Sequence, residues 1–156
     1  MKRSISFTAP EVWWDDLQVG DEWRTGSRTI TEPDLVAWVN LTWLTEGLFT
    51  NLNERDDAMI AGRLVPGALV FSFAEGLTLG AVKIKGIAFM HSEMTVKLPS
   101  RVGDTLHVRT TVTELRKTSR PDRALAWTSN EVVNQRGEIV LSYTALRMML
   151  RRRETE

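Results

Sequence analysis

Four side chains of this sequence could carry acid–base chemistry. Glu75 interrupts the most apolar segment of the chain, PGALVFSFAEGLTLGAVKI, and Glu46 lies in a segment, 44–53, that has no regular pattern. A carboxylate in apolar surroundings has a raised pKa and can then exchange a proton near neutral pH. His91 and His107 lie in two predicted strands. Each of the four also has an ordinary interpretation, as a solvated or ion-paired surface group.

Metal and thiol chemistry find no support in the composition. The sequence has no cysteine, which excludes disulfides, thiol nucleophiles, zinc–thiolate sites and iron–sulfur clusters. We predict neither a metal site nor a cofactor. Twenty basic residues balance twenty acidic ones, so net charge favours neither nucleic acid nor an anionic membrane as a partner. No apolar run has the length of a membrane span or forms a signal-peptide core, so we expect a cytoplasmic protein.

The length of 156 residues predicts a single domain, 1–156, with a loose N-terminal arm over 1–12 and a frayed tail over 151–156. A first strand is predicted over 21–30. A helix follows, because Thr31 can cap it and Asp34, three residues later, can reach back to the cap. A second, short helix is predicted over 54–61, and a long apolar helix begins at Pro66.

The second half of the chain reads as strands. In segment 105–115 we expect Leu106, Val108, Thr110 and Val112 to point inward. In segment 86–98 the alternation assigns one face to Ala88, Met90, Met94, Val96 and Leu98. Turns at 119–122 and 134–137 make the last three strands a meander. One long helix followed by antiparallel strands predicts an α+β fold whose sheet curls around that helix.

Five segments, in order, resemble the MaoC-like hydratases and dehydratases. They extend from about Trp14 to Met148 and read DLQVGDEW, SRTITEPDLVAWVNLT, AGRLVPGALVFSFAEGL, LPSRVGDTLHVRTTV and EVVNQRGEIVLSYTALRMML. The resemblance implies a hot-dog fold, in which a curved antiparallel sheet wraps one long central helix. It also implies hydro-lyase activity on an acyl thioester of coenzyme A or acyl carrier protein. We expect a homodimer, or a heteromer with a catalytically intact relative.

The resemblance also locates the family's catalytic residues. Its signature reads approximately Leu-Thr-Gly-Asp-x-Asn-Pro-Leu-His-x-Asp, whereas this chain reads LTWLTEGLFTN from Leu41. The positions of the catalytic Asp and His are therefore occupied by Leu44 and Phe49. Neither side chain can activate water or deliver a proton, so fast hydration by the family's mechanism is not expected. Together with Trp43 they could instead form an apolar wall suited to an acyl chain; the alternative is that Trp43, like the other tryptophans, packs in the core or at a dimer interface.

The family's oxyanion-binding glycine falls on Gly67, which follows Pro66. A helix N-terminus is electropositive, so the Gly67 amide could receive the thioester oxygen. Alternatively, Pro66 and Gly67 only begin a tightly packed helix. Eight residues later, Glu75 occupies a position where the family often has a polar side chain, and His91 is a further candidate contact.

Basic residues could bind the phosphates of coenzyme A by charge-assisted hydrogen bonds. These are Lys83, Lys85, Arg147 and the run 151–153, although the run is also typical of a solvated tail. Three functions follow. The chain could be a hydratase or dehydratase with altered catalytic groups, a non-catalytic acyl-CoA-binding or partner subunit, or a thioesterase that uses Glu75 or Glu46.

Overall fold

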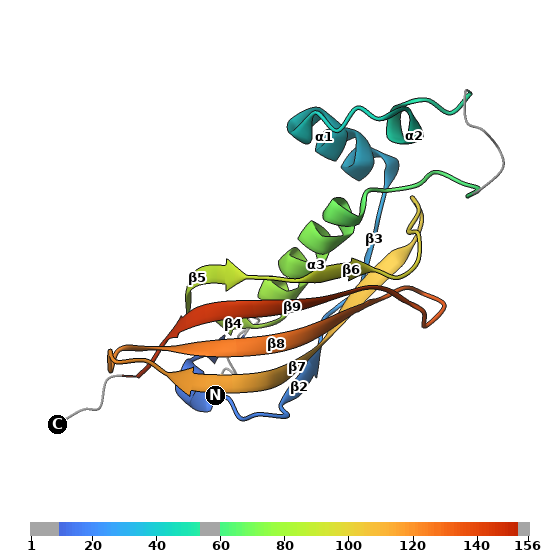
Figure 1. Cartoon of the computed structure of the whole chain (residues 1–156). Helices are drawn as coiled ribbons and strands as arrows, with labels where there is room; N and C mark the ends of the chain where they lie inside the picture. Colours follow the sequence, from blue (N-terminus) through green and yellow to red (C-terminus); the bar gives the residue numbers. More distant parts are fainter. Residues whose placement is uncertain (1–9, 54–59, 153–156) are drawn as a thin grey trace, which may run out of the picture.

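The computed structural model describes residues 10–53 and 60–152, drawn in colour in Figure 1. Most of the helix predicted over 54–61 therefore lies outside the described residues. The described chain forms a seven-stranded sheet, a two-stranded parallel sheet and three α-helices. None of these helices has the length and apolar character that crossing a bilayer requires.

The large sheet has the strand order β2-β7-β8-β9-β5, with β3 also pairing with β7 and β6 with β9. All of its pairs are antiparallel, and the last three strands form the predicted meander. Its strands are β2 (Glu22–Arg24), β3 (Arg28–Thr29), β5 (Gly86–His91), β6 (Met94–Val96), β7 (Thr105–Lys117), β8 (Arg123–Val133) and β9 (Ile139–Leu150).

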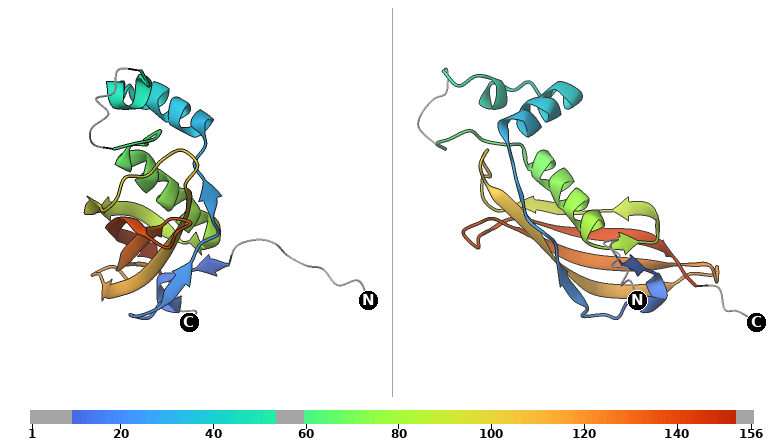
Figure 2. Two further views of the ribbon diagram at one scale, coloured as in Figure 1. Left: turned by 90° about the vertical axis from the view of Figure 1, so that its right-hand side faces the viewer. Right: turned by 180° about the vertical axis from the view of Figure 1, so that it is seen from behind.

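The central helix α3 (Gly67–Ala81) packs inside the curve of this sheet, as both views of Figure 2 show. Its buried positions Val70, Ala74 and Thr78 repeat at the four-residue spacing of one helix face, and Leu69 lies beside them. Leu106, Val108, Thr110 and Val112 of β7 meet this core with at most 1% exposure, so their predicted inward orientation is confirmed. The predicted α+β hot-dog architecture is confirmed.

The first helix, α1 (Glu32–Thr42), begins as predicted. The Thr31 backbone N–H donates to Asp34 Oδ2 (2.8 Å), and the Asp34 N–H is bonded back to the cap. Trp43 ends α1 in the left-handed conformation, with φ of 60°. Segment 44–53, predicted to be irregular, contains the short helix α2 (Gly47–Thr50). Both helices lie at the end of the molecule where α3 begins (Figures 1 and 2).

Two strand predictions were too long. The strand predicted over 21–30 is interrupted at 25–27 and forms β2 and β3. The strand predicted over 86–98 is interrupted at 92–93 and forms β5 and β6, and every residue of both is exposed. The alternation in this segment therefore does not separate buried from exposed side chains in the isolated chain, where both strands pair with β9 and form an edge of the sheet.

The two ends of the chain are ordered as far as the structure describes them. β1 (Glu11–Val12) pairs in parallel with β4 (Lys83–Ile84) just beyond α3. Arg151 donates to Asp15 of the 3-10 helix η1 (Trp14–Asp16) at 2.9 Å, and Arg152 pairs with Asp16. The prediction of a loose arm is therefore wrong for Glu11–Val12, and the prediction of a frayed tail is wrong for 151–152. Ion pairs and backbone hydrogen bonds fix both segments to the rest of the chain.

Asp104, in the loop before β7, joins this loop to the turn between β8 and β9 and is 4% exposed. Its carboxylate accepts from Gln135 Nε2 (2.9 Å), from the Arg101 N–H (2.9 Å) and from Arg136 Nη1 (3.3 Å). Burial alone would raise the pKa of this carboxyl group, but these three donors together hold the pKa below its ordinary value of 3.8. The ionised form therefore stabilises the fold.

We expect Asp104→Asn to lower the free energy of unfolding by about 1–2 kcal/mol at pH 7. A lowered folded pKa contributes stability above pH 3.8 that is lost as pH falls through the folded value. The difference in the free energy of unfolding between the wild type and Asp104→Asn should therefore become smaller under acid conditions. Urea unfolding at a series of pH values would measure it. The exposed Glu114→Gln is the control and should change little. A difference in the free energy of unfolding that stays constant into the acid range would contradict the stabilising role of the ionised Asp104.

Candidate functional site

The predicted site lies at the N-terminal end of α3. Pro66 occupies the cap position, and its carbonyl accepts the amides of Leu69 (3.0 Å) and Val70 (3.2 Å). The first amides of a helix have no carbonyl partner within it, so the Gly67 end carries partial positive charge. The predicted oxyanion-binding role of Gly67 is compatible with this geometry and remains a prediction.

Packing supplies an independent reason for glycine at position 67. A Cβ there would lie 2.6 Å from Cγ2 of Val96 on the edge strand β6, closer than side chains approach one another. The cavity beside Gly67 measures about 30 Å³, room for little more than one water. Apart from Gly67, Ser100 and Pro99, the residues that line it are aliphatic, and none of them has an ionisable side chain. A closed thioester pocket is therefore not formed here by one chain.

Phe49 and Leu44 are core residues. Phe49 is 9% exposed within the hydrophobic core, and Leu44 packs against that core. Arg63 fixes the segment by donating to the Phe49 carbonyl (2.5 Å) and to Glu32 (2.7 Å). Trp43, by contrast, is 85% exposed. The apolar wall predicted from these three residues is therefore wrong for the isolated chain, because the left-handed turn directs Trp43 to solvent.

The two candidate carboxylates have different surroundings. Glu46 is exposed at the start of α2, which agrees with its interpretation as a solvated loop residue. Glu75 is partly buried: it accepts a hydrogen bond from the Tyr143 hydroxyl (2.7 Å) and forms an ion pair with Arg147. Burial and the adjacent Glu75 carboxylate raise the pKa of Tyr143 far above its ordinary value, so its hydroxyl remains a donor.

Glu75 therefore has both carboxylate oxygens engaged inside its own chain. It also lies eight residues after Gly67, which corresponds to about 12 Å along the helix axis. That separation is too long for a single water to link the Glu75 carboxylate to the Gly67 amide. The structure thus does not bring together the two residues that the sequence singled out on α3.

The remaining candidates are dispersed. The His91 side chain is 60% exposed, with Nε2 at 3.7 Å from Glu93. His107 lies on the outward face of β7, and burial together with Arg24 and Arg109 lowers its pKa. Lys85 bonds to Glu11 (2.7 Å), which also lies 3.9 Å from Lys83. The basic residues proposed for phosphates are thus largely paired within the chain. The described residues contain no cluster of three acidic or histidine side chains suited to a metal.

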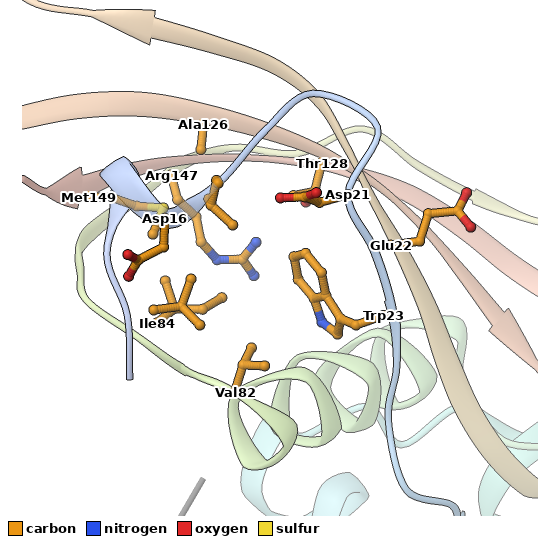
Figure 3. A pocket seen from close by; sticks show the side chains of 12 residues that line it. Asp16, Asp21, Glu22, Trp23, Val82, Ile84, Ala126, Thr128, Arg147 and Met149 are labelled. Carbon is orange, nitrogen blue, oxygen red and sulfur yellow. The ribbon is translucent and has the colours of Figure 1, made fainter. Parts of the chain in front are cut away.

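A larger cavity, of about 290 Å³, lies at the other end of α3, and Figure 3 shows it from close by. Trp23 forms one wall, the segment after α3 forms another, and residues of β8 and β9 form the floor. The Arg147 guanidinium projects into it. Sequence reasoning missed this cavity because four segments that are distant in the chain contribute to it. The signal in the sequence was an arginine, Arg147, within the apolar second half of the last predicted strand.

Comparison with known proteins agrees with the fold. The sequence matches no protein-family model and no curated protein. Among solved structures, a monoamine oxidase regulatory protein of Archaeoglobus fulgius is 24% identical, with a TM-score of 0.83 over 94% of this chain and 99% of the other. A MaoC-like dehydratase of Rhodospirillum rubrum is also 24% identical, with a TM-score of 0.75 over 91% and 99%. An (R)-hydratase of A. caviae is 25% identical, with a TM-score of 0.65 over 86% and 98%.

These likenesses and the helix wrapped by its sheet define the class: the chain has the hot-dog fold of the MaoC-like dehydratases and (R)-hydratases. At these identities the comparison establishes the fold alone. Any conclusion about activity therefore has to be argued from the residues at the Gly67 end of α3.

Proposed function

We propose that this chain is a MaoC-like subunit that binds an acyl thioester at the Gly67 end of α3 and does not hydrate it by the family's Asp and His chemistry. One observation carries the proposal: the cavity beside Gly67 is lined by residues without an ionisable side chain. The family resemblance supplies the class of ligand, a thioester of coenzyme A or acyl carrier protein.

Hydration of an enoyl thioester needs a group that activates water and a donor to the α-carbon, and each contributes about 100- to 10,000-fold. Phe49 and Leu44 lie in the hydrophobic core and offer neither. The electropositive start of α3 remains available to a carbonyl oxygen, and such binding needs no proton transfer. Binding without turnover is therefore the function that these residues favour.

A thioesterase is less well supported. A carboxylate that activates water needs a free oxygen beside that water, whereas Glu75 accepts from Tyr143 and Arg147. Glu46 is exposed on the loop before α2. Either carboxylate would have to move, or a partner chain would have to cover it, before it could work beside a bound thioester.

The second part of the proposal concerns assembly. Large apolar side chains gather on the exposed edge strands β5 and β6 and just after them, with 41–52% exposure for Ile87, Phe89, Met90, Met94, Val96 and Leu98. An apolar edge strand with unpaired backbone groups is a template for pairing with another chain. We propose that a second copy covers this edge and completes the thioester pocket beside Val96. A heteromer with a catalytically intact relative is the alternative assembly.

A panel of 2-enoyl-, 3-hydroxyacyl- and saturated acyl-CoA thioesters tests the proposal. We expect binding by calorimetry but neither hydrated product, dehydrated product nor free coenzyme A above background by mass spectrometry. Gly67→Ala should weaken binding at least about tenfold by blocking close approach of the carbonyl. This change is made in a Val96→Ala background, which removes the atom that the new Cβ would strike, and Val96→Ala alone is the control.

Other outcomes discriminate among the alternatives. Stereospecific hydration would overturn the non-catalytic assignment, and Glu75→Gln and Glu46→Gln would then identify the replacement group. Release of coenzyme A would indicate a thioesterase. Absence of binding, in a sample whose mass in solution is that of a homodimer, would contradict the thioester proposal and leave a partner role. A monomeric mass would contradict the proposed homodimer.

A further inference from the structure

The cavity lined by Val82 and Ile84, just after the C-terminal end of α3, is separated from Gly67 by the length of that helix. Its floor is one face of the sheet, since Ala126 of β8 pairs with Arg147 of β9 and Thr128 lies two residues along on the same side. Aliphatic side chains and the Trp23 ring form most of the remaining wall. Its volume of about 290 Å³ is enough for a small organic molecule.

Two deeply buried donors face this apolar space. Arg147 is 7% exposed; it uses Nη2 for Glu75 and lies over the Phe89 ring at 5.1 Å, and its guanidinium projects into the cavity (Figure 3). A guanidinium has five N–H donors, so several remain for a ligand. Thr128 is 6% exposed and its Oγ1 accepts from Asn130 (3.1 Å), which leaves the hydroxyl proton to donate. Both groups suit a ligand that presents an acceptor oxygen.

The charges around the cavity argue against an anion. Glu75 neutralises Arg147, and Arg152 neutralises Asp16 at the rim. Asp21 and Glu22 also line the cavity, and no basic side chain of the described chain forms an ion pair with either. Asp21 accepts a hydrogen bond from the backbone N–H of Gln18, and Glu22 accepts one from the Thr111 hydroxyl. The net field is therefore negative, while the interior offers donors.

We propose that this cavity is a binding site for a small, neutral, aliphatic carbonyl compound, such as an ester or ketone. Its carbonyl oxygen accepts from Arg147 and Thr128, and its alkyl part contacts Trp23 and the aliphatic wall. The proposal does not depend on thioester binding at the Gly67 end.

Three six-carbon probes with different head groups test the site: methyl hexanoate, hexanoate and hexylammonium. Titration into the ¹⁵N-labelled full chain is followed at the Trp23 indole N–H and at the amides of Thr128 and Met149. Methyl hexanoate should shift all three signals. Hexanoate should bind about tenfold more weakly, because Asp21 and Glu22 oppose its charge at an effective dielectric constant near that of the protein surface.

Two substitutions address the cavity without removing Arg147. Ala126→Met fills the floor and should abolish the shifts, and Thr128→Val removes one donor and should weaken binding about 3- to 10-fold. Val96→Ala, at the other end of α3, should leave binding unchanged. The proposal is overturned if methyl hexanoate moves none of the three signals, if either charged probe binds as tightly, or if Ala126→Met and Thr128→Val bind like the wild type.

Discussion

Arg147→Met should lower the free energy of unfolding by about 3 kcal/mol. The guanidinium is the partner of Glu75, and its removal leaves a carboxylate in a site where the two side chains are only 9% and 18% exposed. Breaking a buried pair from one side costs about 3–5 kcal/mol, and the partial exposure of Glu75 places this pair at the lower end. Urea unfolding followed by tryptophan fluorescence would measure the change.

The double variant Arg147→Met/Glu75→Leu separates the ion pair from simple packing. Replacing both charges with apolar side chains should recover most of the loss, because no uncompensated charge remains. A residual deficit of about 1 kcal/mol is expected, since the Tyr143 hydroxyl loses its acceptor. A double variant no more stable than Arg147→Met would show that Glu75 is not the group left uncompensated.

Phe49→Ala should be the most destabilising single change considered, at about 3–5 kcal/mol. The side chain is 9% exposed in the cluster that joins α1 to the start of α3, so its removal leaves a cavity there. Leu41→Ala, on the neighbouring helix but 80% exposed, is the matched control and should change stability by no more than about 0.5 kcal/mol. Chemical denaturation of the two variants gives the comparison.

The Phe49 prediction also bears on function. If Phe49 is a structural replacement for the family's His, Phe49→Ala lowers stability, and at temperatures where it stays folded it still binds the thioesters that the wild type binds. A variant with wild-type stability and lost thioester binding would instead place Phe49 in a ligand pocket. That result would contradict the assignment of this residue to the core.

The sequence alone was enough to predict where α1 starts and which face of β7 is buried, because both features depend on residues that are close together in the chain. The capping pair Thr31 and Asp34 starts α1, because the two groups that bond are three residues apart. The two-residue alternation in β7 predicted which side chains are buried, since that strand has the core on one face. The assignment of Leu44 and Phe49 to the positions of the catalytic pair comes from the resemblance of the segment after α1 to the MaoC-like signature and remains a prediction.

Tertiary structure decided the features that join distant segments. Glu75 pairs with a residue 72 positions away, so no local pattern could distinguish a free base from an ion-paired carboxylate. The alternation in segment 86–98 did not predict burial, because a strand at the sheet edge lacks a neighbour whatever its sequence. The exposure of Trp43 follows from one left-handed residue, and the cavity at Arg147 exists only where four segments meet around the end of α3. Burial and pairing are properties of the assembled chain, and for that reason the sequence located the candidate residues without fixing what each of them contacts.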